Sequence, residues 1–263
     1  FFVHHHHPMV RQRQEPILLT LFFFFTLQIQ ITESFVMGWS DTWKDILDGG
    51  SKRWKVDDVN AKKIALKHIT DNTSSSTSSS TLKILCPLAG DDPFVFHAWS
   101  EGHDLTAIDL VPEALAAMRA QFGSADSWTS SPKEDEGLIW KHDSGRVTLY
   151  EGDMLKKRSE LENSFDAIYD KDSFGALTKD LRPAFCKRLS DYAKDDATLY
   201  IEVKNKASGR EQGPPFHVET SDLMESTSFG PYFNHFAALG ELYALPMPGM
   251  QQTGHILKRM LRK

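Results

Sequence analysis

The sequence predicts an α/β fold in which a mostly parallel sheet carries helices on both faces. Short apolar runs that end in turn residues alternate with longer segments whose apolar residues recur at helical spacing. Such alternation implies parallel strands joined by crossover helices. The chain has 263 residues, of which 40% are hydrophobic and 25% charged. It is therefore long enough to bury a sizeable core, and its composition excludes collagen-like, coiled-coil and wholly disordered classes.

The charge balance and the cysteine count narrow the function classes. The formal net charge is -6, whereas a general nucleic-acid binder carries a basic face, so we expect no nucleic-acid partner. The two cysteines, Cys86 and Cys186, are too few for a disulfide framework or a structural zinc site. We therefore expect no metal and a reducing, cytoplasmic compartment.

Residues 1–36 differ from the rest of the sequence. A basic patch at Arg11 and Arg13 precedes an apolar run from Ile17 to Leu27, which imitates a signal peptide and is short for a membrane span. We interpret this stretch as a non-core extension, either a targeting peptide or a gene-model artefact upstream of Met37. The core domain is then residues 37–263, for which we expect no membrane contact; a translated segment 9–36 would leave organelle or signal targeting open.

The elements expected in the core domain follow from apolar runs and turn signals. A Ser/Thr run predicts a flexible linker over residues 71–81. Strands are expected at Leu82–Cys86, Leu105–Leu110, Val147–Tyr150, Phe165–Tyr169, Thr198–Val203 and Thr253–Met260. Helices are expected at 92–101, 112–122, 180–194 and 219–228. Residues 123–145 are polar and predict a surface loop, and residues 232–243 give a mixed signal.

A ligand site is expected where these strands end, because the carboxyl ends of parallel strands meet at one edge of the sheet. Leu88–Gly90, Asp109, Asp153 and Asp170 follow the first four strands. Gly90 and Asp109 are 19 residues apart, a spacing typical of a ribose site in which the acid accepts from ribose hydroxyls. The alternative is that strand ends of any α/β protein carry Gly and Asp.

The turn after the first strand does not suit a phosphate. It lacks the G-x-G-x-x-G pattern, and Asp91 and Asp92 would repel a pyrophosphate. S-adenosylmethionine (SAM) fits better, because it has a ribose, an adenine and a sulfonium cation but no phosphate. Asp153 could accept from the adenine amino group while Met154 packs on the ring; the alternative is a helix cap with a core methionine. For Asp170 and Lys171 the alternative is a surface ion pair.

Several motifs resemble the thiopurine S-methyltransferase family. They are Leu85–Gly90, Ala107–Asp109, Val147–Met154, Phe165–Leu177 and, most specifically, Gly213–Phe216. The motifs occur in the family's order and cover most of residues 39–261. The resemblance implies a Rossmann-like class I methyltransferase with a mostly parallel seven-stranded sheet, SAM as methyl donor, no metal, a small-molecule acceptor and a monomeric state.

The resemblance also assigns site residues. By analogy, the donor site is formed by Leu88 and Gly90 at the methionine part of SAM, Asp109 at the ribose, and Asp153 and Met154 at the adenine, with Trp43 covering the donor. The acceptor would lie near Trp54 and Asp57, in a pocket walled by Pro214 and Phe216. Two departures stand out: Lys171 replaces the family's usual arginine, and Leu47 stands where some members carry a tryptophan. A lysine cannot make the bidentate contact of an arginine to the SAM tail or the acceptor.

The expected reaction is direct, in-line methyl transfer to a soft nucleophile, either a thiol or thiopurine-like compound, a halide, or a selenium or tellurium species. Asp57 or Asp170 is the candidate base for a neutral thiol, and Lys171 could favour an anionic acceptor. A catalytically degenerate SAM-binding module, motivated by the departures at Leu47 and Lys171, is the main alternative. A nicotinamide-dependent oxidoreductase is a weaker one.

Overall fold

The structure is a computed structural model, and it describes residues 41, 43–46, 48–50, 59–73, 81–134, 137–207, 213–245 and 247–262. The chain divides into two compact units, Phe1–Gly50 and Ser51–Lys263. In the first unit, residues 43–46 are helical. The sheet and the candidate site described below belong to the second unit.

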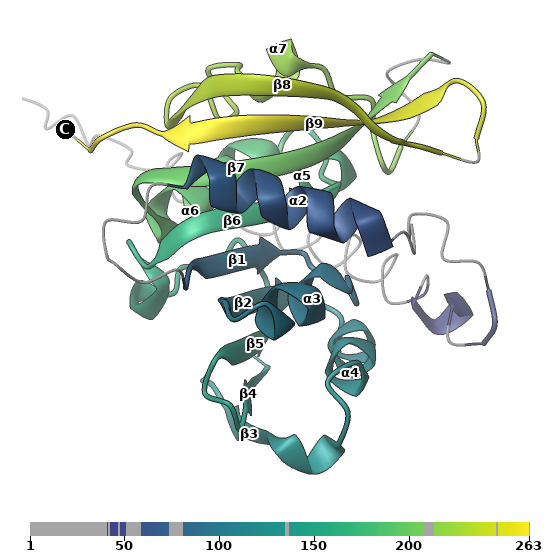
Figure 1. The fold of residues 1–263 in the computed structure, drawn as a ribbon, viewed down its shortest axis with the longest axis vertical. Coiled ribbons are helices and arrows are strands. Elements are labelled where there is room, and N and C mark those ends of the chain that lie inside the picture. The colour runs from purple at the N-terminus through teal and green to yellow at the C-terminus, as the bar shows by residue number, and fades with distance from the viewer. Residues whose placement is uncertain are drawn as a thin grey trace, which may run out of the picture. The chain divides into compact units, whose positions relative to one another are not determined.

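The centre of the second unit is a run of parallel strands (Figure 1). In spatial order these strands are β5 (Val147–Glu151), β2 (Asp104–Asp109), β1 (Lys83–Pro87), β6 (Phe165–Lys171) and β7 (Ala193–Lys206). Each neighbouring pair in this order is parallel. Because helices cover both faces, the strands are buried on both sides and read as continuous apolar runs. The fold class expected from the sequence is confirmed.

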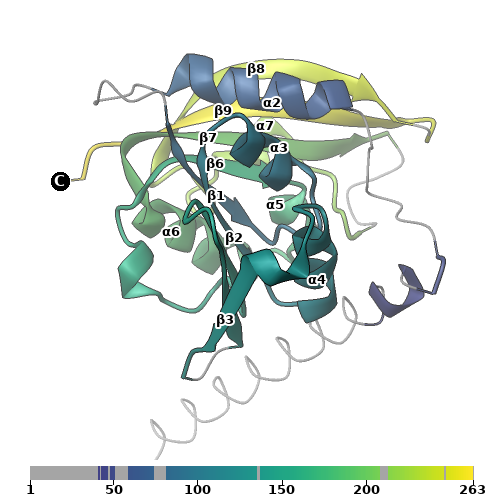
Figure 2. The same cartoon turned by 60° about the horizontal axis from the view of Figure 1, so that its bottom comes forward.

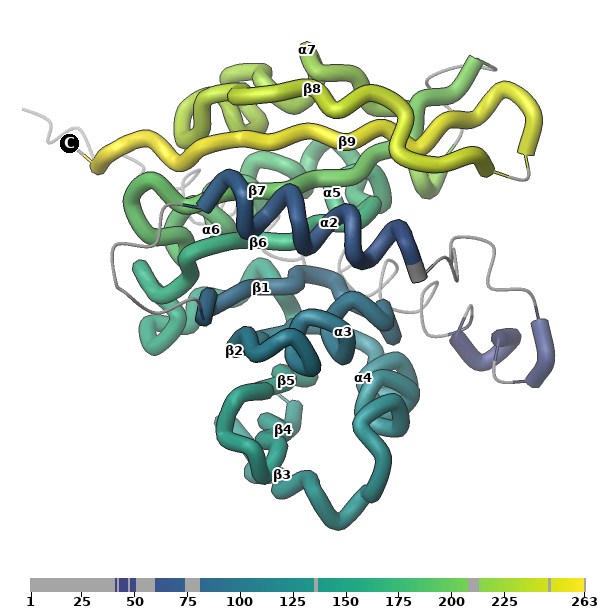
Figure 3. Tube along the Cα trace, viewed as in Figure 1, coloured from purple at the N-terminus to yellow at the C-terminus, as the bar shows by residue number. Residues whose placement is uncertain are grey.

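Antiparallel strands extend this centre on both sides, and the strand count differs from the expected seven. Within the described residues, nine strands form one sheet in the order β3-β4-β5-β2-β1-β6-β7-β9-β8. The outer strands are β3 (Trp128–Pro132), β4 (Leu138–His142), β8 (Phe233–Ala244) and β9 (Met250–Arg259). Figure 3 shows the β8–β9 hairpin beside β7.

The hairpin of β3 and β4 lies in the segment 123–145, which the sequence predicted to be a surface loop. That prediction was wrong for residues 128–132 and 138–142, which form strands. The mistake arose because β3 is exposed from Thr129 to Pro132 and therefore has the polar composition of a loop. The hairpin is anchored by Trp128 and His142, whose rings lie 5.0 Å apart and both pack against Phe122. An edge strand of this kind carries too little apolar pattern to be recognised.

The helices occupy both faces of the sheet (Figures 1 and 2). They are α2 (Val59–Asn72), α3 (Phe94–Ser100), α4 (Pro112–Ala120), α5 (Ser173–Ala176), α6 (Arg182–Tyr192) and α7 (Thr220–Leu223). Helices α2 and α3 lie on one face, and α5 and α6 on the other. The helix expected at 219–228 is shorter than predicted. Among the helices described, none is long and apolar enough to cross a bilayer.

A stack of aromatic rings joins α2 and α3 to the sheet. Phe94 of α3 stacks on Tyr169 of β6 with ring centroids 3.7 Å apart, and Tyr169 stacks in turn on Tyr200 of β7 at 5.8 Å. His68 of α2 lies parallel to Tyr200 at 6.2 Å. Aromatic contacts of this kind add to area burial, and they fix both helices over the strands whose ends form the candidate site.

Replacing Ile168 by alanine should lower the free energy of unfolding by about 2–5 kcal/mol, because the change leaves a cavity in a packed core. Ile168 is fully buried in β6 and pairs with Leu85 on one side and Leu199 on the other. Urea denaturation followed by circular dichroism measures the change. Phe236→Ala is the control, since that ring is 61% exposed on the edge strand β8; an equal loss in both variants would contradict the assigned core.

Candidate active site

The turn after β1 and the end of β2 are joined by a buried carboxylate. Asp109 accepts the Gly90 N–H at Oδ2 (2.7 Å) and the Val111 N–H at Oδ1 (2.9 Å). Burial raises the pKa of Asp109, and these N–H donors oppose the rise. Leu88 and Gly90 have positive φ values of 42° and 56°, so the turn is tight enough to present backbone to a ligand. The structure thus brings Gly90 and Asp109 into direct contact; the sequence assigned both to this edge of the sheet but did not predict the hydrogen bond between them.

The loop after β5 lies against the same strand end. The Gly152 N–H donates to the Asp109 carbonyl (2.8 Å), which places the following Asp153 and Met154 at this edge. Asp153 Oδ1 accepts the Leu155 N–H (2.8 Å), and Met154 is buried. These contacts are the ones expected from the alternative interpretation, in which Asp153 caps the start of a helix or turn and Met154 packs in the core. The second carboxylate oxygen of Asp153 takes no part in that bond.

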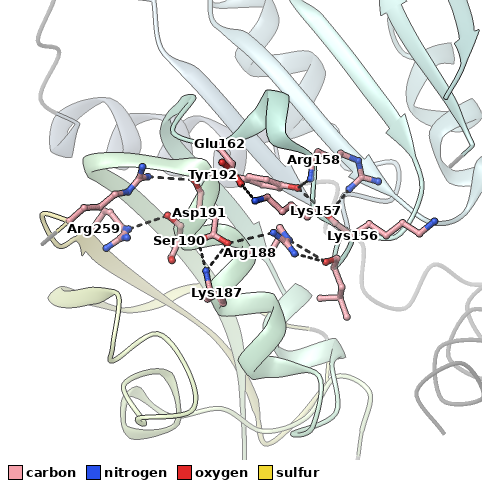
Figure 4. A network of polar contacts seen from close by, with 12 residues as sticks. Lys156, Lys157, Arg158, Glu162, Lys187, Arg188, Ser190, Asp191, Tyr192 and Arg259 are labelled. Carbon is pink, nitrogen blue, oxygen red and sulfur yellow. Dashed lines mark hydrogen bonds and ion pairs between the residues drawn. The ribbon is translucent and has the colours of Figure 1, made fainter. Parts of the chain in front are cut away.

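The position of this loop depends on side chains that the sequence did not indicate (Figure 4). The Arg158 guanidinium, 1% exposed, donates to the Asp153 carbonyl (3.0 Å). Tyr192 of α6 accepts the Arg158 N–H at its hydroxyl (2.9 Å), and Arg188 of α6 donates to the Leu155 carbonyl (3.0 Å). Because arginine is mostly exposed in proteins, nothing in the sequence indicates that Arg158 is buried. Helix α6 therefore fixes the loop that carries Asp153.

Asp170 joins the end of β6 to the end of β1. Its Oδ1 accepts the Ser173 N–H (2.9 Å), and the Ser173 hydroxyl donates to the Pro87 carbonyl (2.9 Å). Asp170 is fully buried, and among the described residues its Oδ2 has no hydrogen-bond partner. Burial raises the pKa of Asp170 to about 7. A carboxyl group with that pKa and a free oxygen has the properties of a proton acceptor near neutral pH.

Lys171 makes an ion pair, as the alternative reading expected, but the pair is largely buried. Its Nζ lies 3.6 Å from Asp92 Oδ2, and the two side chains are 13% and 16% exposed. The Tyr169 hydroxyl also donates to Asp92 Oδ2 (3.4 Å). Burial alone would lower the pKa of Lys171, yet Asp92, Glu202 and Asp172 outweigh it and raise the pKa. Lys171 is therefore a fixed cation beside the turn that holds Gly90.

The loop after β7 lies next to these residues. The Phe216 N–H donates to the Gly175 carbonyl of α5 (2.7 Å), which brings the Gly213–Phe216 motif to the end of β6. The guanidinium of Arg182 lies 6.0 Å from the Phe216 ring centroid and 4.4 Å from that of Phe174. The aromatic ring of Phe216 thus has a fixed place at the edge that carries Asp170 and Lys171.

The remaining predicted residues are placed only in part. Trp43 lies in the helical segment 43–46 of the first unit. Leu47, Trp54 and Asp57 lie outside the described residues. In the described ranges of the chain, no three His, Cys, Asp or Glu side chains converge as metal ligands.

Solved structures share the fold at low identity. One is the 1,6-didemethyltoxoflavin-N1-methyltransferase of Burkholderia thailandensis, solved with S-adenosylhomocysteine: 15% identical, TM-score 0.55, covering 97% of this chain and 94% of that chain. Another is TehB from Haemophilus influenzae, 15% identical with a TM-score of 0.52, covering 79% and 64%. These likenesses support the class I methyltransferase architecture.

Sequence comparison gives the family. A curated thiopurine S-methyltransferase of Legionella pneumophila (strain Corby) is 24% identical over 184 residues, which are 70% of this chain and 78% of that protein. That of Psychrobacter cryohalolentis is 21% identical over 71% of this chain and 81% of its own length. The match to the thiopurine S-methyltransferase of Legionella pneumophila (strain Paris) spans 63% of that protein. The family model "Thiopurine S-methyltransferase (TPMT)" matches residues 38–237, so the chain belongs to the thiopurine S-methyltransferase family of SAM-dependent methyltransferases.

Proposed function

We propose that the chain transfers the methyl group of SAM to a small, soft nucleophile by in-line displacement. The observation that carries this proposal is the convergence of four strand ends: the Gly90 turn, Asp109 and the Gly152 loop are hydrogen bonded to one another, and Asp170 is linked to Pro87 through Ser173. Such an edge of a parallel sheet is where α/β proteins bind their ligands.

The chemistry of these residues fits SAM. Asp109 keeps lone pairs beyond its two backbone bonds and would hold the ribose hydroxyls. Asp153 and Met154 would hold the adenine, and Leu88 and Gly90 the methionine part. The acidic side chains after the turn suit a cationic sulfonium and oppose a phosphate. Trp43 would cover the donor, and Lys171 would contact its carboxylate as a point charge.

The acceptor would lie beside Asp170 and Lys171. Pro214 and Phe216 would form one wall, since the Phe216 N–H is bonded to α5 at that edge. Trp54 and Asp57, which lie outside the described residues, are assigned to the acceptor by the family resemblance alone. SAM supplies an activated methyl group, whose bond to sulfur breaks as the bond to the acceptor forms. The chain's own contribution is alignment and exclusion of water, which can lower a barrier by about 7–11 kcal/mol.

A thiol acceptor also has to lose a proton, and Asp170 is the group proposed to take it. Its pKa of about 7 balances proton affinity against availability of the ionised form. A halide carries no proton and needs no base. A SAM-binding module without turnover is the less favoured alternative, because the family is one of enzymes.

Product analysis tests the proposed function. The protein is incubated with methyl-labelled SAM and, separately, with thiols, iodide and selenite, and the volatile products are identified by mass spectrometry. We expect labelled methyl product from at least one thiol or halide and none without protein. Binding of SAM with no methyl transfer to any acceptor would instead support the binding module.

Asp109→Ala should weaken SAM binding by about 1–3 kcal/mol, because hydrogen bonds to a charged acceptor are lost. Isothermal titration calorimetry gives the dissociation constant. Asp104→Ala is the matched control, since Asp104 begins the same strand at its opposite end. Unchanged affinity in the Asp109 variant would refute the ribose assignment.

Asp170→Asn should lower kcat for a neutral thiol by about 10²- to 10⁴-fold, the range of general-base catalysis, while kcat for iodide stays near that of the unmodified protein. Steady-state assays with both acceptors measure the contrast. If both rates fall together, Asp170 supports the strand end through Ser173 and does not accept the proton.

A further inference from the structure

A cluster of buried charges lies behind Lys171, on the face of the sheet covered by α2 and α3. We call it the charged cluster, and it consists of Asp92, Lys171, Asp172, Glu202 and Lys204. Glu202 and Lys204 belong to β7 and are 1% and 3% exposed. Glu202 pairs in register with Lys171 of β6. Buried charges are costly unless they are paired, so each member needs a partner.

Asp172 and Lys204 neutralise each other. Lys204 Nζ lies 3.1 Å from Asp172 Oδ2 and also donates to the Gln252 side-chain oxygen. Gln252 Nε2 donates to the other Asp172 oxygen at 3.1 Å. Asp172 has a positive φ of 64°, an uncommon conformation for a residue other than glycine. These contacts hold the turn that follows Lys171 and leave the pair without net charge.

Glu202 differs from the other carboxylates because hydroxyl groups occupy both of its oxygens. Tyr200 donates to Oε1 (2.8 Å) and Tyr243 of β8 donates to Oε2 (2.7 Å). Burial raises the pKa of Glu202 to about 7, while Lys171 and the two hydroxyls act in the opposite direction. Asp92 and Asp172 formally balance the two lysines, so the ionisation of Glu202 changes the cluster from neutral to singly negative.

We propose that Glu202 sets the charge that a methyl acceptor meets at Lys171, so that an anionic acceptor is favoured while Glu202 is protonated. This inference rests on the proposed function, since it assigns the acceptor to the Lys171 side of the edge. Lys171, Asp92 and Asp172 are the partly exposed members of the cluster, and Lys171 and Asp92 lie beside the Gly90 turn, whereas Glu202 is buried behind them. Glu202 therefore acts through Lys171 as a positioning residue.

Titratable and charged groups on several neighbouring elements face Glu202. The titratable and charged groups are Tyr169 and Lys171 of β6, Tyr200 and Lys204 of β7, Tyr243 of β8, Asp172 in the turn after β6, and Asp92 in the turn before α3. The tyrosine pKa values are all raised by burial, so these rings stay neutral. Burial raises the pKa of Glu202 to about 7, and outside the cluster the pKa of Asp170 is raised to the same range.

Iodide is the probe for this effect, because it carries one negative charge at every pH used. The measurements are made in the Asp170→Asn protein, since the pKa of Asp170, which lies on the acceptor side of the same edge, is also raised to about 7. Below the pKa of Glu202 the cluster is neutral, and above it the extra negative charge repels iodide. At an effective dielectric near 20 and with salt screening, the KM for iodide should rise by about three- to tenfold between pH 6 and pH 8.

Three variants identify the titrating group. Glu202→Gln keeps the side-chain shape without the charge and should give a KM that stays at the low, acidic value at both pH values. Tyr243→Phe removes a donor to the ionised carboxylate and should move the inflection to higher pH. Glu241→Gln is the matched control, an exposed glutamate on β8, and should keep the unmodified profile. A pH-independent KM in the Asp170→Asn protein, or an unchanged profile when Glu202→Gln is added to it, would overturn the proposal.

A binding measurement distinguishes failure of this proposal from failure of the proposed function. Iodide is titrated calorimetrically, at pH 6 and pH 8, into Asp170→Asn protein loaded with S-adenosylhomocysteine, which has no methyl group to transfer. Weaker binding at pH 8 that disappears in Glu202→Gln supports the proposal even if iodide is not methylated, in which case the proposed reaction with halide fails instead. Equal binding at both pH values, or no binding at either, overturns the role of Glu202.

Discussion

The architecture of the candidate site depends on one buried carboxylate, that of Asp109. A carboxylate removed from water has to be given hydrogen-bond donors, and here the donors are the backbone N–H groups of Gly90 and Val111. The Gly152 N–H adds a third link, to the Asp109 carbonyl. The conformation of the turn after β1 and the approach of the β5 loop therefore both follow from satisfying one residue at the end of β2.

Asp170 occupies the matching place on the other side of β1, but its surroundings differ. Both oxygens of Asp109 have backbone donors, whereas among the described residues one oxygen of Asp170 has none. Both side chains are buried, so the difference in hydrogen bonding separates their roles: Asp109 suits a fixed acceptor for ligand hydroxyls, and Asp170, with a pKa of about 7, suits proton exchange. Neighbouring strand ends of one sheet thus offer two kinds of carboxyl group.

The strands and strand-end residues that follow from a local sequence pattern could be predicted from the sequence. The strands β1, β2, β5 and β6 were predicted to within two residues, because strands buried on both faces are continuous apolar runs. Gly90 and Asp109 were correctly assigned to adjacent strand ends, but the hydrogen bond between them was not predicted. The hairpin of β3 and β4 was missed because β3 is polar and exposed, although Leu138–Trp140 of β4 is a short apolar run. Arg158 and Glu202 were missed for another reason: arginine and glutamate are mostly exposed in proteins, and Tyr243, which binds Glu202, is distant from it in sequence.

The lysine at position 171 is best understood from the carboxylates around it. An ammonium group is a compact charge that can be stabilised from several directions, whereas a guanidinium is a planar fork suited to one bidentate partner. Asp92, Glu202 and Asp172 approach from the β1 turn, from β7 and from the turn after β6, and together they raise the pKa of Lys171. Such a group stays protonated and cannot itself act as a base. The fixed charge at the end of β6 and the variable charge of Glu202 then belong to different residues, so the charge at this edge can change with pH while the cation stays in place.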